Sequence, residues 1–252
     1  MQPNDPFKKL FYHDTDYIAY RKFDYGETKD GILFLSGFKS DMNGTKAVAL
    51  QQLCCAQKRN FLCFDYFAHG ASTGDFSKGT IGMWLENALL VLDKLTAGPQ
   101  ILVGSSMGGW LMLLVALLRP ERVKALVGIA AAPDFSEDLI WEKLSAQDQI
   151  KLLEEGEILL DDDYCTSNFL IHRDFIIEAR KHLLLRDTIN INCKVRLLHG
   201  MHDVDVPYDT ALQLAKRLTS QDVTLHLVKN GGHRLSEPAE MALLESVVQE
   251  LF

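Results

Sequence analysis

The pattern Gly104-x-Ser106-x-Gly108 places a serine where it can act as a nucleophile. The apolar stretch 100–103 precedes it and the apolar stretch 110–118 follows it, so the pattern predicts a strand, a sharp turn and a helix, with the serine at the turn. Glycines two residues before and after the serine allow the strand and the helix to pass close to the turn. Because a serine hydroxyl is a weak nucleophile until a base removes its proton, a histidine and a carboxylate are expected elsewhere in the chain.

A carboxylate and a histidine both occur downstream, each directly after a strand-like segment. Asp203 follows residues 194–198, and His233 follows residues 223–228. The order serine, aspartate, histidine differs from the two common serine-protease orders. We therefore predict that Ser106 is the nucleophile, His233 the general base and acid, and Asp203 the carboxylate that holds the imidazole tautomer.

Two other acids compete with Asp203 for the third position, Asp205 and Asp209. Asp203 is preferred because it comes first after its strand, on the turn expected to face His233. Asp205 is interpreted as a turn or surface acid. Asp209 is interpreted as a residue of the first turn of a helix, where a negative charge is favourable.

The other histidines are interpreted as structural or exposed. His199 ends a strand, so a hydrogen-bonded structural role is expected, whereas His202 and His226 are expected to be exposed and His69 to lie in a loop. Ser105 points to the other side of its strand and is interpreted as structural. No cluster of histidine, cysteine and acidic residues has metal-ligand spacing, so we expect neither a metal nor a cofactor.

Acyl transfer passes through an oxyanion that backbone N–H groups must stabilise. One donor is expected to be Met107, the residue after the nucleophile. The second should come from the loop after the strand-like stretch 31–35, where Gly37 permits a turn that aims the N–H of Phe38. The alternative is that residues 37–38 only form a turn that ends the strand.

Strand-like and helical segments alternate along most of the chain, which predicts an α/β fold with a mostly parallel central sheet and helices on both faces. The stretch 31–35 is apolar throughout, as in a strand buried on both faces. The expected strands are 17–23, 31–35, 61–64, 100–103, 123–130, 194–198 and 223–228, and the expected helices are 45–59, 80–95, 110–118, 208–218 and 237–251.

The alternation breaks between residues 132 and 192, where we expect helical fragments and no strong strand. A segment of this length is too long for an ordinary connection, so we predict a helical cap inserted at about 133–190 into a single domain spanning residues 1–252. Its apolar side chains either roof a pocket or pack the cap onto the core, and packing is preferred for most of them. These residues are Phe135, Leu139, Ile140, Trp141, Leu144, Phe169, Ile171, Phe175 and Ile176. The basic residues between 172 and 182 are interpreted mainly as a solvated helix face.

Composition narrows the class of protein. The chain has 252 residues and a net charge of −8, without a basic run, which argues against a nucleic-acid partner. The longest apolar stretch is far below a membrane span, and residues 1–10 contain no apolar signal core. The odd number of cysteines, five, indicates free thiols in a reducing compartment, so we expect a cytoplasmic protein.

Most of the chain, from Tyr17 to the C-terminus, resembles the α/β-hydrolase fold, and three stretches are similar to serine hydrolases of the abhydrolase-domain protein 10 type. These stretches are residues 35–44, 98–112 and 196–203. The family is described as acyl-glucuronide esterases and S-depalmitoylating thioesterases. The resemblance implies the same triad and the same two oxyanion donors, whereas the cap is less alike and implies no substrate preference. Animal members carry a mitochondrial targeting segment, of which the first residues here show no sign.

The expected function is therefore a serine hydrolase that cleaves carboxylic esters or thioesters through an acyl-enzyme. The substrate is expected to be a small-molecule ester or acyl thioester, or an S-acylated protein. Two alternatives stay open: an acyltransferase that uses the same triad, and a non-catalytic binding protein that keeps the α/β-hydrolase fold. The sequence does not decide between oxygen ester and thioester, and it leaves acyl-chain length and oligomeric state open.

Overall fold

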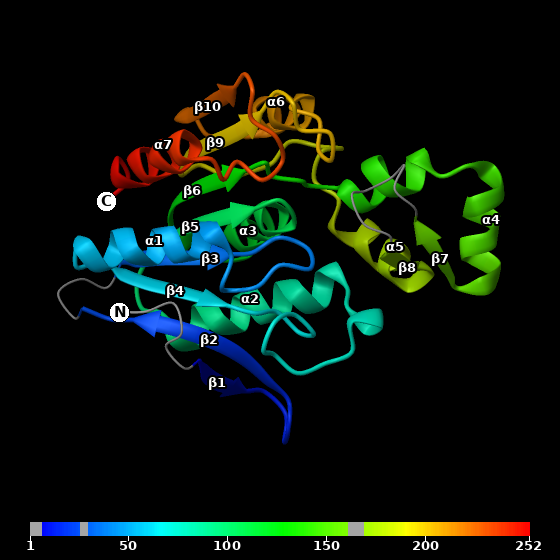
Figure 1. Ribbon diagram of the computed structural model, residues 1–252, viewed down its shortest axis with the longest axis horizontal. Coiled ribbons are helices and arrows are strands. Elements are labelled where there is room, and N and C mark those ends of the chain that lie inside the picture. Colours follow the sequence, from blue (N-terminus) through cyan, green and yellow to red (C-terminus); the bar gives the residue numbers. More distant parts are fainter. Residues whose placement is uncertain (1–6, 26–29, 161–168) are drawn as a thin grey trace.

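A twisted sheet of eight strands forms the centre of the protein in the computed structural model, which describes residues 7–25, 30–160 and 169–252, without the side chain of Phe169 (Figure 1). Strand β2 pairs antiparallel with β1 and β4, and all other neighbours are parallel. The predicted α/β fold with a mostly parallel sheet is confirmed. In spatial order the strands are β1 (Lys8–Phe11), β2 (Tyr17–Phe23), β4 (Asn60–Phe64), β3 (Gly31–Leu35), β5 (Gln100–Ser105), β6 (Val123–Ile129), β9 (Lys194–Gly200) and β10 (Val223–Val228).

Helices cover both faces of this sheet. The side chains of β3 alternate between two hydrophobic clusters, with Leu33 and Leu35 in one and Ile32 and Phe34 in the other. This is why β3 is apolar at every position. The first cluster contains buried side chains of α2 (Ile81–Leu95), α3 (Met107–Leu118) and α6 (Asp209–Arg217), and the second contains those of α1 (Thr45–Ala56) and α7 (Pro238–Gln249).

The segment after β6 forms a cap at one end of the sheet (Figure 1). The expectation of helical fragments with no strong strand is wrong in one respect, because β7 and β8 form an antiparallel hairpin. In β7 Ile158 and Leu160 are buried while Leu159 is exposed, so the strand does alternate, but four residues are too few to show a period in the sequence. The cap elements are the single turns Ser136–Ile140 and Trp141–Lys143, α4 (Ala146–Glu155), β7 (Glu157–Leu160), β8 (Phe169–His172), α5 (Arg173–Ala179) and the turn Arg180–His182; further single turns lie outside the cap at Phe76–Lys78 and Pro120–Arg122.

The apolar side chains of the cap mostly pack it onto the core. Ile140, Leu144, Ile171, Phe175 and Ile176 belong to the same buried cluster as β3 and α3. This shared cluster supports the proposal that the chain is one domain.

A hydrogen bond and ion pairs also hold the cap. Trp110 of α3 donates from Nε1 to the carbonyl of His182 at 3.0 Å. Within the cap, Arg180 pairs with Glu137 at 2.7 Å, so the basic stretch is partly paired rather than simply solvated.

No helix within the described ranges is both long and apolar enough to cross a membrane. The described cysteines are free thiols, with Cys54 and Cys63 buried and Cys55 exposed, and Cys165 lies outside the described residues.

Candidate active site

Ser106 lies at the sharp turn between β5 and α3, as predicted. Its backbone has φ +53° and ψ −119°, a combination that residues with a side chain rarely adopt. The turn is fixed by hydrogen bonds from Ser106 N–H to the Ile129 carbonyl at 2.9 Å and from Ala132 N–H to the Ser106 carbonyl at 3.1 Å. A Cβ on Gly104 would overlap the carbonyl of Gly108, so the strand and helix approach each other too closely for any other residue there.

The structure brings Ser106, His233 and Asp203 into one hydrogen-bonded row. His233 Nε2 lies 3.1 Å from Ser106 Oγ, and His233 Nδ1 lies 2.8 Å from Asp203 Oδ2. The three residues follow β5, β10 and β9, whose carboxyl ends meet at the same edge of the sheet. The carboxylate requires the proton on Nδ1, which leaves Nε2 free to accept the proton of the serine hydroxyl.

Asp203 is held as a carboxylate by its surroundings. Its Oδ1 accepts the N–H groups of Asp205 at 3.0 Å and Val206 at 2.8 Å. Burial by itself raises the pKa of Asp203, but the hydrogen bonds from His199 and His233, with the His233 charge and the Val206 N–H, outweigh it and hold the pKa well below its ordinary value.

Of the three acids considered, Asp203 is the one whose carboxylate lies within hydrogen-bond distance of the His233 imidazole. Asp205 contacts Asp203 through its backbone, and Asp209 begins α6, as expected. Asp203, Asp205 and His233 are also a group whose ligand atoms lie within 4.8 Å of one another, but two of the three already bond to each other.

His199 supports the carboxylate, a role that its position at a strand end did not reveal. The ring is fully buried, and its Nε2 lies 2.9 Å from the Val206 carbonyl and 3.2 Å from Asp203 Oδ2. Both partners accept hydrogen bonds, so Nε2 carries the proton. Nδ1 of this ring is buried without a hydrogen-bond partner among the described residues.

Of the two expected oxyanion donors, Met107 directly follows Ser106 and Phe38 lines the same cavity as Ser106. Met107 is the first residue of α3, so its N–H has no acceptor within the helix. The loop after β3 lies against the serine, since a Cβ on Gly37 would sit 3.4 Å from Ser106 Cβ. Phe38 follows in this loop, and its ring packs against Phe76 at a centroid distance of 5.2 Å.

Two buried side chains, His69 and Asp65, fix the loop after β3. Neither was predicted from the sequence to belong to the site. His69 donates from Nδ1 to the Phe67 carbonyl at 3.1 Å and accepts the Lys39 N–H at Nε2, 3.2 Å away. Burial lowers the pKa of His69, which keeps it in the neutral form that this pair of bonds requires.

Asp65 is the second of these side chains. It accepts the N–H groups of Met42 at 2.7 Å and Ala71 at 2.8 Å, and burial raises its pKa to about 6.

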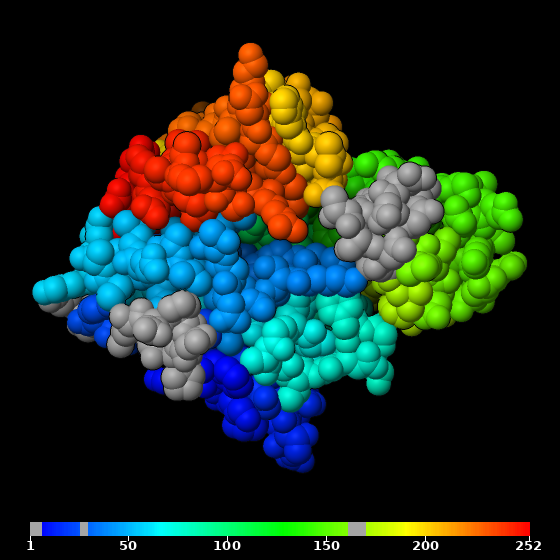
Figure 2. All heavy atoms as spheres, viewed as in Figure 1, coloured from blue at the N-terminus to red at the C-terminus, as the bar shows by residue number. Residues whose placement is uncertain are grey.

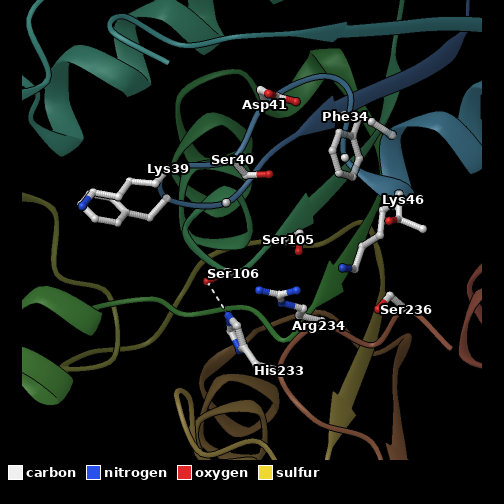
Figure 3. Close-up of a pocket in the computed structure, with 15 residues that line it drawn as sticks. Phe34, Lys39, Ser40, Asp41, Lys46, Ser105, Ser106, His233, Arg234 and Ser236 are labelled. Atoms are coloured by element: carbon white, nitrogen blue, oxygen red, sulfur yellow. Dashed lines mark hydrogen bonds between the residues drawn. The ribbon is translucent and has the colours of Figure 1, made fainter. Parts of the chain in front are cut away.

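A cavity of about 400 Å³ opens beside the nucleophile, between the loop after β3 and the loop after β10 (Figures 2 and 3). Ser106 and His233 form part of its wall, and none of the cap residues proposed as a roof lines it. The other lining residues are Phe34, Gly37, Phe38, Lys39, Ser40, Asp41, Gly44, Thr45, Lys46, Ala47, Ser105, Arg234 and Ser236.

Comparisons with known proteins identify the fold and the family of the chain. A family model described as the alpha/beta hydrolase fold matches residues 33–150, and one described as the prolyl oligopeptidase family matches residues 94–249. The mouse protein named palmitoyl-protein thioesterase ABHD10, mitochondrial, is 43% identical over 237 residues, which are 93% of this chain and 78% of that protein. Its human counterpart is 39% identical over 241 residues, 94% of this chain and 77% of that protein. A solved structure of alpha/beta hydrolase domain-containing protein 10 from mouse has a TM-score of 0.91 and 40% identity, and the match covers 98% of both chains.

The relatives correct the expected location. The proteins from mouse, rat, orangutan, human and cattle are all named mitochondrial, so the expectation of a cytoplasmic protein is wrong and the relatives point to mitochondria. That expectation depended on the free cysteines and on the lack of an apolar signal core in residues 1–10, and free thiols indicate a reducing compartment without identifying which one. With 39–43% identity to these relatives over most of its length, the chain is a hydrolytic enzyme and belongs to the ABHD10 family of α/β-hydrolases.

Proposed function

We propose that the protein hydrolyses carboxylic thioesters and esters through an acyl-enzyme, with Ser106 as nucleophile, His233 as general base and acid, and Asp203 as the orienting carboxylate. The observation that carries the proposal is the row of contacts from Asp203 through His233 to Ser106, at 2.8 Å and 3.1 Å. A base within hydrogen-bond reach of a serine hydroxyl is the arrangement that activates it.

In the first half of the reaction, Ser106 Oγ attacks the acyl carbon while its proton moves to His233 Nε2. The new negative charge on the carbonyl oxygen is stabilised by the N–H groups of Met107 and Phe38. The intermediate then collapses, the bond to the leaving thiol or alcohol breaks, and His233 returns the proton to the leaving atom. Asp203 stays ionised throughout and stabilises the imidazolium, in keeping with its low pKa.

In the second half, water takes the place of the leaving group. His233 Nε2 accepts a proton from the water as it attacks the acyl carbon. The second intermediate then collapses, the bond between the acyl carbon and Ser106 Oγ breaks, and His233 returns the proton to Oγ as the free acid leaves. Each half uses the same base and the same oxyanion donors.

Thioesters are included because the ABHD10 relatives are named palmitoyl-protein thioesterases. By analogy, the substrate is an acyl thioester, either of a small thiol or of a protein cysteine. The choice of thioester over oxygen ester rests on this likeness.

The first experiment is labelling with a fluorophosphonate, followed by location of the adduct by peptide mass spectrometry. We expect a single adduct on Ser106, lost in His233→Ala. Loss of the adduct in that variant with an unchanged circular dichroism spectrum would show that the imidazole activates the serine.

A substrate panel then tests the reaction itself. Thioesters, oxygen esters and prolyl amides of matched acyl groups are compared, and Ser106→Ala should lose at least a thousandfold in kcat for every substrate cleaved. Full activity in Ser106→Ala would overturn the proposal. Preferential cleavage of prolyl amides would favour a peptidase, and trapping of the acyl group by an added alcohol in place of water would favour an acyltransferase.

A further inference from the structure

Polar side chains line most of the cavity beside Ser106, and three of the lining residues are cationic: Lys39, Lys46 and Arg234. Figure 3 shows the Lys46 ammonium and the Arg234 guanidinium reaching into the same space, next to the hydroxyls of Ser105 and Ser236. Lys46 comes from the first turn of α1, and Arg234 directly follows His233 in the loop after β10. The two side chains therefore enter the cavity that Ser106 lines from two different elements (Figure 3).

Neither cation forms an ion pair with another residue that the structure describes. The acid whose charge acts on Lys46 is Glu240, but its Oε2 already accepts the Glu237 N–H at 2.9 Å. Asp41 also lines the cavity, but it lies on the far wall from Arg234 (Figure 3), and its Oδ1 accepts the Asn43 N–H at 2.7 Å.

Holding the positive charges of Lys46 and Arg234 in one cavity costs free energy unless an anion lies nearby. Burial lowers the pKa of Lys46, the charge of Glu240 opposes this shift, and the smaller effect of the neighbouring Arg234 charge adds to it. The N-terminus of helix α1 adds its partial positive charge to that of the two cations. No acidic residue in its first turn and no side chain at its N-cap, Gly44, offsets this charge. An anion placed between Lys46 and Arg234 would relieve this repulsion.

The position of the cations relative to His233 indicates which part of a substrate they would meet. His233 must hand a proton to the leaving atom, so the leaving group lies on the His233 side of the scissile bond. Arg234 is the next residue on that side. The apolar cap residues do not line this cavity.

We propose that Lys46 and Arg234 bind a carboxylate or phosphate carried by the leaving group of the substrate. The site thus favours acyl esters and thioesters of anionic alcohols or thiols over those of neutral ones. This inference rests on the proposed function, because it assigns the leaving-group side of that same site.

The test compares three thioesters with one butanoyl group: those of 3-mercaptopropionate, 2-mercaptoethyl phosphate and the neutral 3-mercaptopropanol. We expect Lys46→Met and Arg234→Gln each to lower kcat/KM about tenfold for one or both anionic substrates, and less than twofold for the neutral one. Lys229→Met is the matched control, since it removes one exposed charge from the same loop as Arg234 but outside the cavity. The carboxylate and phosphate substrates distinguish the two kinds of anion.

A second readout does not depend on activity. Inorganic phosphate is titrated into the full chain by calorimetry, and binding should weaken at least tenfold in Lys46→Met and in Arg234→Gln but not in Lys229→Met. Equal losses on anionic and neutral substrates, or phosphate binding that neither variant changes, would overturn the inference. If no thioester shows Ser106-dependent hydrolysis, the proposed function fails, whereas the phosphate titration still decides whether the cavity binds anions.

Discussion

Replacing Ser106 by glycine should stabilise the fold relative to Ser106→Ala, although both variants lose the nucleophile. Ser106 has φ +53° and ψ −119°, where a Cβ costs about 1–3 kcal/mol. Alanine keeps this Cβ and glycine removes it. Glycine also gives the unfolded chain more freedom, which offsets about 0.5–1 kcal/mol of the gain. The expected difference is about 1 kcal/mol in favour of glycine.

The difference in unfolding free energy between Ser106→Gly and Ser106→Ala isolates the cost of the strained backbone conformation. Both lose the contact between Ser106 Oγ and His233, so that loss cancels in the difference. In thermal unfolding, about 1 kcal/mol corresponds to roughly 2–4 °C in Tm for a chain of this size. Urea unfolding measures the free energy of unfolding of each variant directly.

Ser105 provides the matched control. It is the last residue of β5, and its φ is not positive. Glycine should therefore be less stable than alanine at position 105, by about 0.5–1 kcal/mol. If glycine is not the more stable variant at position 106, or if both positions favour glycine equally, the argument from backbone strain is refuted.

Three other perturbations give separate checks. Asp203→Asn should lower kcat about 10⁴-fold toward a reactive thioester, because an amide can hold the imidazole in the wrong tautomer; steady-state kinetics with little loss would contradict the orienting role. The pKa of Asp65 is raised by burial to about 6, so its stabilisation of the fold is complete below the unfolded value of 3.8 and is lost as pH rises through about 6. Urea unfolding between pH 4 and 7 should show this fall, about 3 kcal/mol at most, and Asp65→Asn should remove it. Trp110→Phe loses the bond to the His182 carbonyl and should cost about 1 kcal/mol of stability. The same variant should speed proteolysis within residues 134–190, and unchanged cleavage there would show that the cap is held by other contacts.

The local pattern of the chain was sufficient for most of the secondary structure. The apolar stretch at 31–35 and the turn at Ser106 each lie where the sequence predicted them, because both patterns reflect burial or backbone geometry within a few residues. The hairpin of β7 and β8 was missed, since its pairing joins two short segments that carry no clear period alone.

The site was predictable where chemistry demanded a residue type and an order along the chain. Ser106, Asp203 and His233 were named on that ground, and their catalytic roles stay a prediction that the labelling experiment tests. The supporting residues were not predictable in the same way. His199 supports Asp203 and His69 supports the Lys39 N–H through hydrogen bonds that the fold creates, and nothing in their local sequence distinguishes them from the other histidines of the chain.

The sequence by itself determined the α/β alternation, the serine turn and the order of the candidate triad, because these depend on side-chain periodicity and on what acyl chemistry requires. Tertiary structure decided which side chains meet. Parallel strands bring their carboxyl ends to one edge, so Ser106 and His233 come within 3.1 Å although 127 residues separate them. The same assembly places Lys46 of α1 and Arg234 around one cavity. No local sequence pattern predicts this, because the charge of a cavity depends on which elements the fold brings together.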